Sequence, residues 1–304
     1  MMMQVAIDAY MTASLDRMSG NTRSAYQKDL SQLCQYLQVQ GVENWGEVTS
    51  EQITAYLTEL CKTHGYCRSS VVRKFAAMKS FFRYLCRIGI IPLNPTEKVA
   101  SPGIGLHQKK EVPQLLSQEQ IDCLFEQIDK QTPGGLRDNA FLHLLLCTGM
   151  LASELLSLDL GDVHTADATV LLPSAGQPGQ KNRRDRVLPL STMAVDAIQC
   201  YLEQSRPLLV RGLHEQQALF LNRHDGQRLS RQGFWLLVRG YARKVGVAIT
   251  PRVLRQTCVV RMLNAGMDIS AAQQLLGITT VAHIRKYIAA TTRLEQAEEG
   301  GIQQ

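Results

Sequence analysis

The chain has 304 residues, of which 45% are apolar and 20% are charged, and its formal net charge is +6. A chain of this length is longer than one ordinary domain, so we expect two domains, each with its own core. The composition excludes disordered and fibrous classes. The amino terminus lacks a basic patch leading into an apolar stretch, and the longest apolar run, 141–152, is too short to span a bilayer. These features favour a soluble, cytoplasmic protein with no membrane partner.

The cysteines are scattered through helical patterns, with no CxxC pair and no histidines at ligand spacing. We therefore expect buried free thiols in a reducing compartment, and neither a metal site nor a cofactor. The eight residues are Cys34, Cys61, Cys67, Cys86, Cys123, Cys147, Cys200 and Cys258.

The positive charge is concentrated in two windows that contain no acid, one between Glu59 and Glu97 and the other between Asp225 and Asp268. A single window of this kind is typical of a solvated helix face. Two windows, one in each half of the chain, favour a polyanion held at two places, and nucleic acid is the best candidate. The cations of the first window are Lys62, Arg68, Arg73, Lys74, Lys79, Arg83 and Arg87. Those of the second are Arg228, Arg231, Arg239, Arg243, Lys244, Arg252, Arg255 and Arg261.

The first third of the chain is predicted to be helical. One helix has Asn21 and Thr22 as candidate caps, and the next begins at Thr49 or Ser50. A third covers 69–87, with a basic stripe formed by Lys79, Arg83 and Arg87 beside an apolar face. Gly89 and the Asn-Pro pair at 94–95 are expected to end this helix, and residues 101–113 are expected to form a linker. The apolar positions are Tyr26, Leu30, Leu33, Leu37, Val71, Phe75, Met78, Phe82 and Leu85.

The remainder is predicted to be mixed. Ser117 and Gln120 form a capping box, and a very apolar helix covers about 137–146. Strands at 168–172 and 186–190 flank a turn at 176–182, which predicts a hairpin with a basic tip. Helices resume at Ser191, Ser230, Pro251 and Asp268 before a polar tail.

In its first half the chain resembles the core-binding domain of the tyrosine recombinases, a family that includes phage and integron integrases. The similar segments are Asn21-Thr22 with Tyr26 and Leu30, and the stretch from Arg73-Lys74 through 81–85 to the Asn-Pro pair. The resemblance covers nearly the whole chain. It implies a mainly α fold with a small antiparallel β-sheet, in which a helical SAM-like core-binding domain (1–100), a linker (101–114), a catalytic-type domain (115–290) and a tail (291–304) form a clamp around DNA.

The second half carries motifs similar to the catalytic boxes of this family. The segment 147–155 is similar to Ala-Thr-Gly-Leu-Arg-Val-Ser-Glu-Leu, with Leu151 at the position of the catalytic arginine. The segment 180–190 is similar to the hairpin Gly-Lys-Gly-Asn-Lys-Glu-Arg, and counting back from Pro189 places Lys181 at the catalytic lysine. The resemblance therefore implies that one catalytic cation is retained and another is lost.

Four further catalytic positions lie towards the carboxy terminus. The segment 250–257 resembles Thr-Pro-His-x-Leu-Arg-His-Ser, so Arg255 keeps the second arginine while Arg252 replaces a histidine. The segment 275–278 resembles Leu-Leu-Gly-His, so Ile278 replaces the second histidine. Tyr287 follows nine residues later, at the position of the nucleophile. Of the six catalytic positions, Lys181, Arg255 and Tyr287 match the family.

The resemblance implies that a tyrosine hydroxyl attacks a DNA phosphate and forms a 3′-phosphotyrosyl link without metal or cofactor. Negative charge then builds on the phosphate oxygens and needs fixed cationic donors, which Leu151 and Ile278 cannot provide. We therefore expect a DNA-binding protein with strongly reduced or absent cleavage. The alternative is an active recombinase that uses Tyr287, with Arg252 replacing the lost arginine. A protein-interaction module without DNA binding is disfavoured by the two basic windows.

The expected partner is double-stranded DNA. The protein would bind it as a single chain, as a homo-oligomer or together with a related recombinase. The expected DNA contacts are cations of the basic windows and of the hairpin tip: Arg73, Lys74, Lys79, Arg83, Arg87, Arg183, Arg184, Arg239, Arg243 and Lys244.

Overall fold

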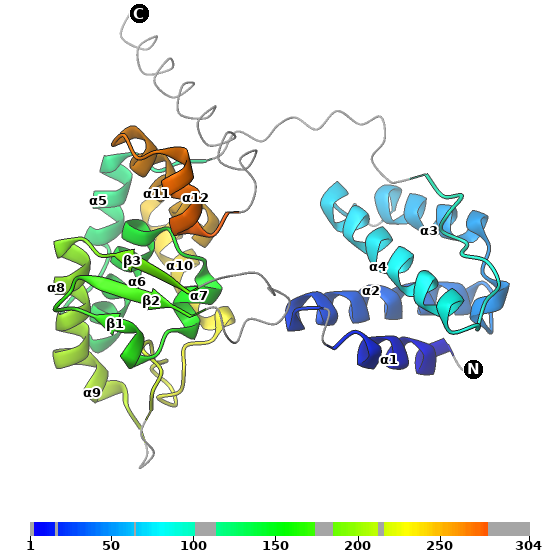
Figure 1. Cartoon of the computed structure of the whole chain (residues 1–304), viewed down its shortest axis with the longest axis horizontal. Coiled ribbons are helices and arrows are strands. Elements are labelled where there is room, and N and C mark those ends of the chain that lie inside the picture. The colour runs from blue at the N-terminus through cyan, green and yellow to red at the C-terminus, as the bar shows by residue number, and fades with distance from the viewer. Residues whose placement is uncertain are drawn as a thin grey trace, which may run out of the picture. The chain divides into compact units, whose positions relative to one another are not determined.

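The structure is a computed structural model of the chain. It describes residues 3–15, 18–63, 65–100, 114–173, 185–211 and 216–278. They form two compact units, one from 3 to 100 and the other from 114 to 278 (Figure 1). The expected linker, hairpin tip and tail lie outside the described residues, so the domain boundaries stay predictions. None of the described helices is both long enough and apolar enough to cross a membrane.

The first unit is a bundle of helices in which α2 (Gly20–Val39) packs on α4 (Arg68–Arg87) and α1 (Met3–Ala13) packs on both. Its core is aromatic: Trp45 makes edge contacts with Phe81 and Phe82, and its indole Nε1 donates a hydrogen bond of 2.9 Å to the carbonyl oxygen of Met3. This bond fixes α1 to the 3-10 helix that follows α2. The elements are α1 (Met3–Ala13), α2 (Gly20–Val39), the 3-10 helix η1 (Trp45–Glu47), α3 (Ser50–Lys62) and α4 (Arg68–Arg87).

The predicted apolar faces of this unit are confirmed, but its helix starts are partly corrected. Ser19, and neither Asn21 nor Thr22, caps α2, because its hydroxyl accepts from the main-chain N–H of Thr22. Of the two candidates for the start of α3, Thr49 is the cap. Helix α1 was not predicted, since the sequence before Ser19 has no distinct start signal.

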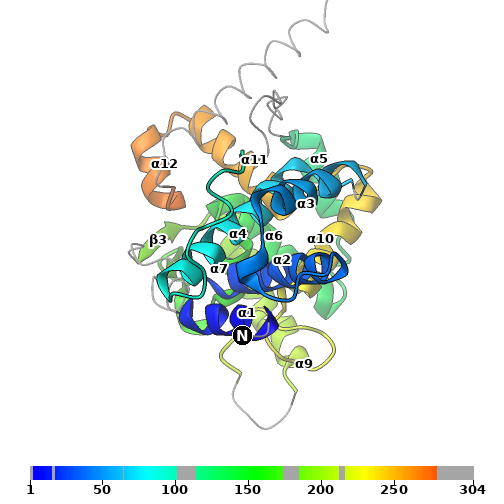
Figure 2. The same ribbon diagram turned by 90° about the vertical axis from the view of Figure 1, so that its right-hand side faces the viewer.

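The second unit surrounds the long apolar helix α6 (Pro133–Thr148), which contacts α8 (Thr192–Cys200), α11 (Pro251–Asn264) and the π-helix η3 (Tyr201–Ser205). A three-stranded antiparallel sheet in the order β1-β2-β3 lies beside it, with Val170 paired to Val163 and to Leu188 (Figure 1). Helix α12 packs on α11 and on β3, and α11 and α12 lie side by side in Figure 2. Both predicted strands are therefore confirmed as neighbours.

The helices of the second unit are α5 (Gln118–Glu126), α6 (Pro133–Thr148), α7 (Ala152–Ser157), α8 (Thr192–Cys200), η3 (Tyr201–Ser205), α9 (Arg206–Leu209), α10 (Arg231–Val245), α11 (Pro251–Asn264) and α12 (Ile269–Leu276). A 3-10 turn, η2 (Leu160–Asp162), precedes the strands β1 (Val163–His164), β2 (Thr169–Leu172) and β3 (Arg186–Pro189).

The start signals of this unit are largely confirmed. Ser117 forms its capping box with Gln120, and Ser191, Ser230 and Asp268 cap α8, α10 and α12. Helix α6 begins at Pro133, earlier than predicted, because Thr132 caps it. The short elements α7 and β1 were not predicted.

All eight cysteines are free thiols, but the expectation that they are buried is only partly right. Cys34 and Cys258 are buried, whereas Cys61 and Cys67 are exposed. The apolar spacing around Cys61 and Cys67 does not continue to these positions, which lie at the end of α3 and just before α4.

Candidate functional site

Arg255 is the centre of the candidate site. It lies on α11, whose first turn is capped by the hydroxyl of Thr250. Its Nη1 donates to the carbonyl oxygen of Gly149 at 2.7 Å, and its Nη2 donates to that of Leu276 at 2.9 Å. Arg255 thus joins the turn after α6 to the last residue of α12.

Leu151 lies two residues beyond this turn, at the N-cap position of α7. Its main-chain N–H donates to Glu154 Oε2 at 2.7 Å, and the same carboxylate forms an ion pair with Arg186 of β3. Arg186 also donates to the carbonyl oxygen of Leu275 at 2.8 Å. The side chain of Leu151 is partly exposed and offers neither charge nor hydrogen bond.

Ile278 lies just after α12, two residues beyond the Leu276 carbonyl oxygen that Arg255 contacts. Its main-chain N–H donates to the carbonyl oxygen of Gln273 at 3.0 Å, and its side chain packs against a small cluster that includes Val259 and Leu276. The structure therefore brings the segments of Leu151, Arg255 and Ile278 together. Lys181 and Tyr287 lie outside the described residues.

Arg252 lies in the first turn of α11, one turn before Arg255. Its side chain is exposed and has no hydrogen bond or ion pair with the described part of the chain. A guanidinium in this position is available to a ligand.

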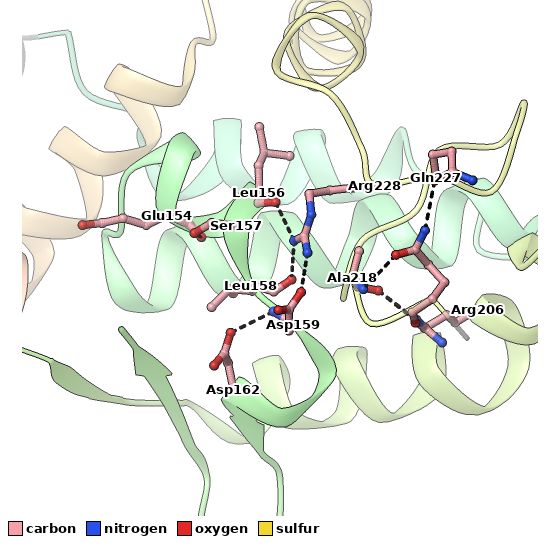
Figure 3. A network of polar contacts seen from close by, with 11 residues as sticks. Glu154, Leu156, Ser157, Leu158, Asp159, Asp162, Arg206, Ala218, Gln227 and Arg228 are labelled. Carbon is pink, nitrogen blue, oxygen red and sulfur yellow. Dashed lines mark hydrogen bonds and ion pairs between the residues drawn. The ribbon is translucent and has the colours of Figure 1, made fainter. Parts of the chain in front are cut away.

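A second arginine network supports the residues that follow α7. Arg228 donates to the carbonyl oxygens of Leu156 and Leu158 at 3.0 and 2.9 Å and forms an ion pair with Asp159 (Figure 3). In the same figure the carboxylate of Glu154 points away from this network. Arg228 therefore fixes the end of α7 and is committed to the fold.

Most cations of the first basic window lie on the surface of α4. Arg83 and Arg87 are exposed, and Cζ of Arg87 lies over the ring of Tyr84, 5.6 Å from its centroid. Lys79 is partly buried, with its Nζ 4.6 Å from the ring centroid of Phe75. This face is open to a polyanion.

Lys74 departs from this pattern. It is only 3% exposed, and its Nζ contacts Asp29 Oδ1 at 2.8 Å and Gln32 Oε1 at 2.6 Å. Asp29 is buried on α2, far away in the sequence, so the spacing on α4 could not reveal this contact. The expectation that Lys74 lies on a phosphate-contacting surface is corrected.

In the second window, Arg239, Arg243 and Lys244 are exposed on α10. Trp235, which sequence reasoning missed, is 46% exposed on the same helix. It lies four residues before Arg239, and this spacing places both on one face. That spacing was the available signal. Arg183 and Arg184 lie outside the described residues.

Glu154 and Arg186 were also missed as parts of the site. Glu154 belongs to the first catalytic motif, so its position was a signal, but nothing in the sequence pairs it with Arg186. Within the described ranges, no group of histidine, cysteine, aspartate or glutamate side chains is arranged to hold a metal ion.

The two units and the arginine between the α6 turn and α12 define a class of protein, a two-domain recombinase-type fold. Residues 9–89 match the phage integrase N-terminal SAM-like domain, and residues 114–293 match the phage integrase family. The chain is 39% identical over 290 residues to a tyrosine recombinase XerC of Roseiflexus castenholzii, covering 94% of this chain and 88% of that protein. It is 31% identical over 277 residues to a tyrosine recombinase XerD of Listeria monocytogenes, covering 90% and 89%.

The fold is also similar to solved structures. The Tn1549 transposon integrase in complex with a circular intermediate DNA has a TM-score of 0.73 at 16% identity, covering 98% of this chain and 99% of that chain. A lambda integrase dimer bound to a core site has a TM-score of 0.70 at 14% identity, covering 94% and 95%. The chain belongs to the phage integrase family of tyrosine recombinases.

Proposed function

We propose that this protein binds double-stranded DNA and that it cleaves DNA strands very slowly or not at all. DNA binding is supported by the exposed cations of α4 and α10. It is also supported by the similar folds of the Tn1549 transposon integrase in complex with DNA and of the lambda integrase dimer bound to a core site. Phosphate contacts from both units would supply most of the affinity.

The observation that carries the second half of the proposal is the place of Leu151. By the resemblance of segment 147–155, Leu151 stands where the family has a catalytic arginine, and it lies beside the turn that Arg255 holds. A pentavalent phosphate needs fixed donors on its non-bridging oxygens, and losing one such donor typically lowers the rate about a hundredfold to a thousandfold. A leucine side chain supplies no donor at all.

The other substitutions act in the same direction. Ile278 packs its hydrocarbon side chain on an apolar cluster, where a histidine would have offered a donor to the phosphate. Losses of groups that act together are not additive, so the combined loss of rate is not the product of the single losses. Lys181, Arg255 and Tyr287 remain the candidate catalytic residues.

A second candidate function, an active recombinase, is favoured by one observation. The guanidinium of Arg252 is exposed and unengaged by the described residues. In this reading Arg252 supplies the missing cation to the phosphate that Tyr287 attacks. It would have to reach bidentate geometry from a different main-chain position, to within a fraction of an ångström.

A selection from a random duplex library that contains nicks distinguishes the two candidates. Bound DNA is recovered once under native conditions and once after denaturation, for the natural chain and for Tyr287→Phe. We expect enrichment under native conditions only, equal for both chains. DNA that survives denaturation on the natural chain but not on Tyr287→Phe would establish the active recombinase.

A restored chain provides the positive control. The triple variant Leu151→Arg, Arg252→His and Ile278→His returns the family's residues to all three substituted positions. We expect it to form an adduct that survives denaturation on the DNA enriched by the natural chain, and to lose it with Tyr287→Phe. No adduct from the restored chain would indicate that these three positions do not explain inactivity.

We further propose that the protein acts in the cytoplasm, closes around DNA as a clamp, and assembles there with a second copy or with a related recombinase. Crosslinking on a duplex that carries two copies of the selected sequence tests the assembly. A complex of one chain per duplex at saturation would contradict it.

A further inference from the structure

A group of three charges, two of them buried, lies between α2 and α4 in the first unit. Asp29 is 2% exposed, and two cations from neighbouring positions on α4 approach its two carboxylate oxygens. Lys74 contacts Oδ1 and Arg73 contacts Oδ2. The group therefore contains one negative and two positive charges, and its net charge is positive.

Lys74 is fully enclosed within this group. Its Nζ donates to Asp29 and to Gln32, and it lies 5.0 Å from the ring centroid of Tyr66. A buried carboxylate requires a partner of opposite charge, and Lys74 meets that requirement entirely inside the fold.

Arg73 is placed differently, with 42% of its side chain exposed. It uses Nη1 alone, towards Asp29 and the carbonyl oxygen of Ala25, and the described residues offer no partner to Nε or Nη2. Nε and Nη2 form one edge of the planar guanidinium, the edge that matches two oxygens of a phosphate.

We infer that Lys74 is a positioning residue for DNA binding: by neutralising Asp29 inside the fold, it leaves the charge and the free edge of Arg73 available to a DNA phosphate. This inference rests on the proposed DNA binding. It assigns Lys74 an effect on affinity although its ammonium group does not reach the surface.

A purely structural role for Lys74 would leave the charge that Arg73 offers to DNA unchanged, whereas a positioning role links that charge to Lys74 and Asp29. Without Lys74, Arg73 is the only cation among the described residues that contacts Asp29, and its charge is cancelled. Without both Lys74 and Asp29, Arg73 again carries a full charge. Each phosphate contact contributes about 0.9 to the slope of the logarithm of affinity against the logarithm of salt concentration.

The test measures this slope by fluorescence anisotropy on a labelled duplex of random sequence, from about 50 to about 300 mM potassium chloride. We expect Lys74→Met to lower the slope by about 0.9, which is an eightfold loss of affinity at about 0.1 M salt if the curves meet at 1 M. Adding Asp29→Asn should restore the slope. Lys98→Met, an exposed lysine of the same unit without contact to this group, is the matched control and should retain it.

Folding of each variant is checked by circular dichroism, and Arg73→Gln gives an independent arm if Lys74→Met does not fold. Arg73→Gln should lower the slope by about 0.9, and an unchanged slope would overturn the inference. A folded Lys74→Met with the natural slope, or a double variant that does not regain it, would overturn it as well. If the natural chain itself shows no salt-dependent binding, the proposed DNA binding fails, which is a different result.

Discussion

Replacing Gly149 by alanine tests how closely the site is packed. Gly149 ends α6 with a φ of 62°, and a Cβ added there would lie 2.8 Å from Leu276 Cδ2 and 3.1 Å from Cys258 Sγ. Both neighbours are buried and have little room to move. The left-handed backbone costs an alanine about 1 kcal/mol, and forcing a methyl group into a filled core typically costs about 1–3 kcal/mol. We therefore expect Gly149→Ala to lower the free energy of unfolding by about 2–4 kcal/mol.

Gly246→Ala is the matched control. Gly246 ends α10 with a φ of 73°, but nothing lies within 4 Å of its added Cβ, so only the backbone term of about 1 kcal/mol applies. Urea unfolding followed by circular dichroism, fitted with separate transitions for the two units, measures both variants. Equal losses at the two glycines would refute the claim that the α6 turn is packed tightly against Leu276 and Cys258.

Three further predictions concern stability and binding. Burial lowers the pKa of His143 to about 4, so the unfolded chain takes up a proton below its usual pKa of about 6.5 before the folded chain does. The free energy of unfolding should therefore fall by about 1–2 kcal/mol between pH 7 and pH 4, a value reduced because the ring is partly exposed to solvent. The fall should be smaller in His143→Phe, and equal pH profiles of the two chains in urea unfolding would contradict this. Glu154→Gln leaves Arg186 without its buried partner and should cost about 3 kcal/mol in the same assay, so a loss below about 1 kcal/mol would argue against the pair. Arg239→Gln should lower the salt slope of DNA binding by about 0.9, and an unchanged slope would remove α10 from the proposed contacts.

Local signals predicted several helix starts of the second unit and the hairpin strands. The hydroxyl and carboxylate caps at Ser117, Ser191, Ser230 and Asp268 act within three residues of themselves, so the sequence contains both partners. Alternation and turn residues likewise predicted the pairing of β2 with β3. Such features depend on neighbours along the chain.

Contacts between distant segments could not be predicted in the same way. Lys74 was interpreted as a surface cation because its partner, Asp29, lies 45 residues earlier. Arg228 counted towards the positive charge of a basic window, yet it is committed to carbonyl oxygens and to Asp159. For the site, the motifs predicted that Leu151, Arg255 and Ile278 come together, but not that Glu154 and Arg186 hold them.

The bonds around Arg255 have a consequence for how such a protein can change over time. Arg255 donates to the carbonyl oxygens of Gly149 and Leu276. Leu151 and Ile278 likewise make their hydrogen bonds through main-chain N–H groups, to Glu154 and to Gln273. Every residue type except proline offers these groups, so the side chains at 151 and 278 can be exchanged without breaking the bonds that shape the site. Selection on chemistry can therefore relax here while the shape of the domain persists, and a descendant of such a chain could lose or regain reactivity through a few substitutions.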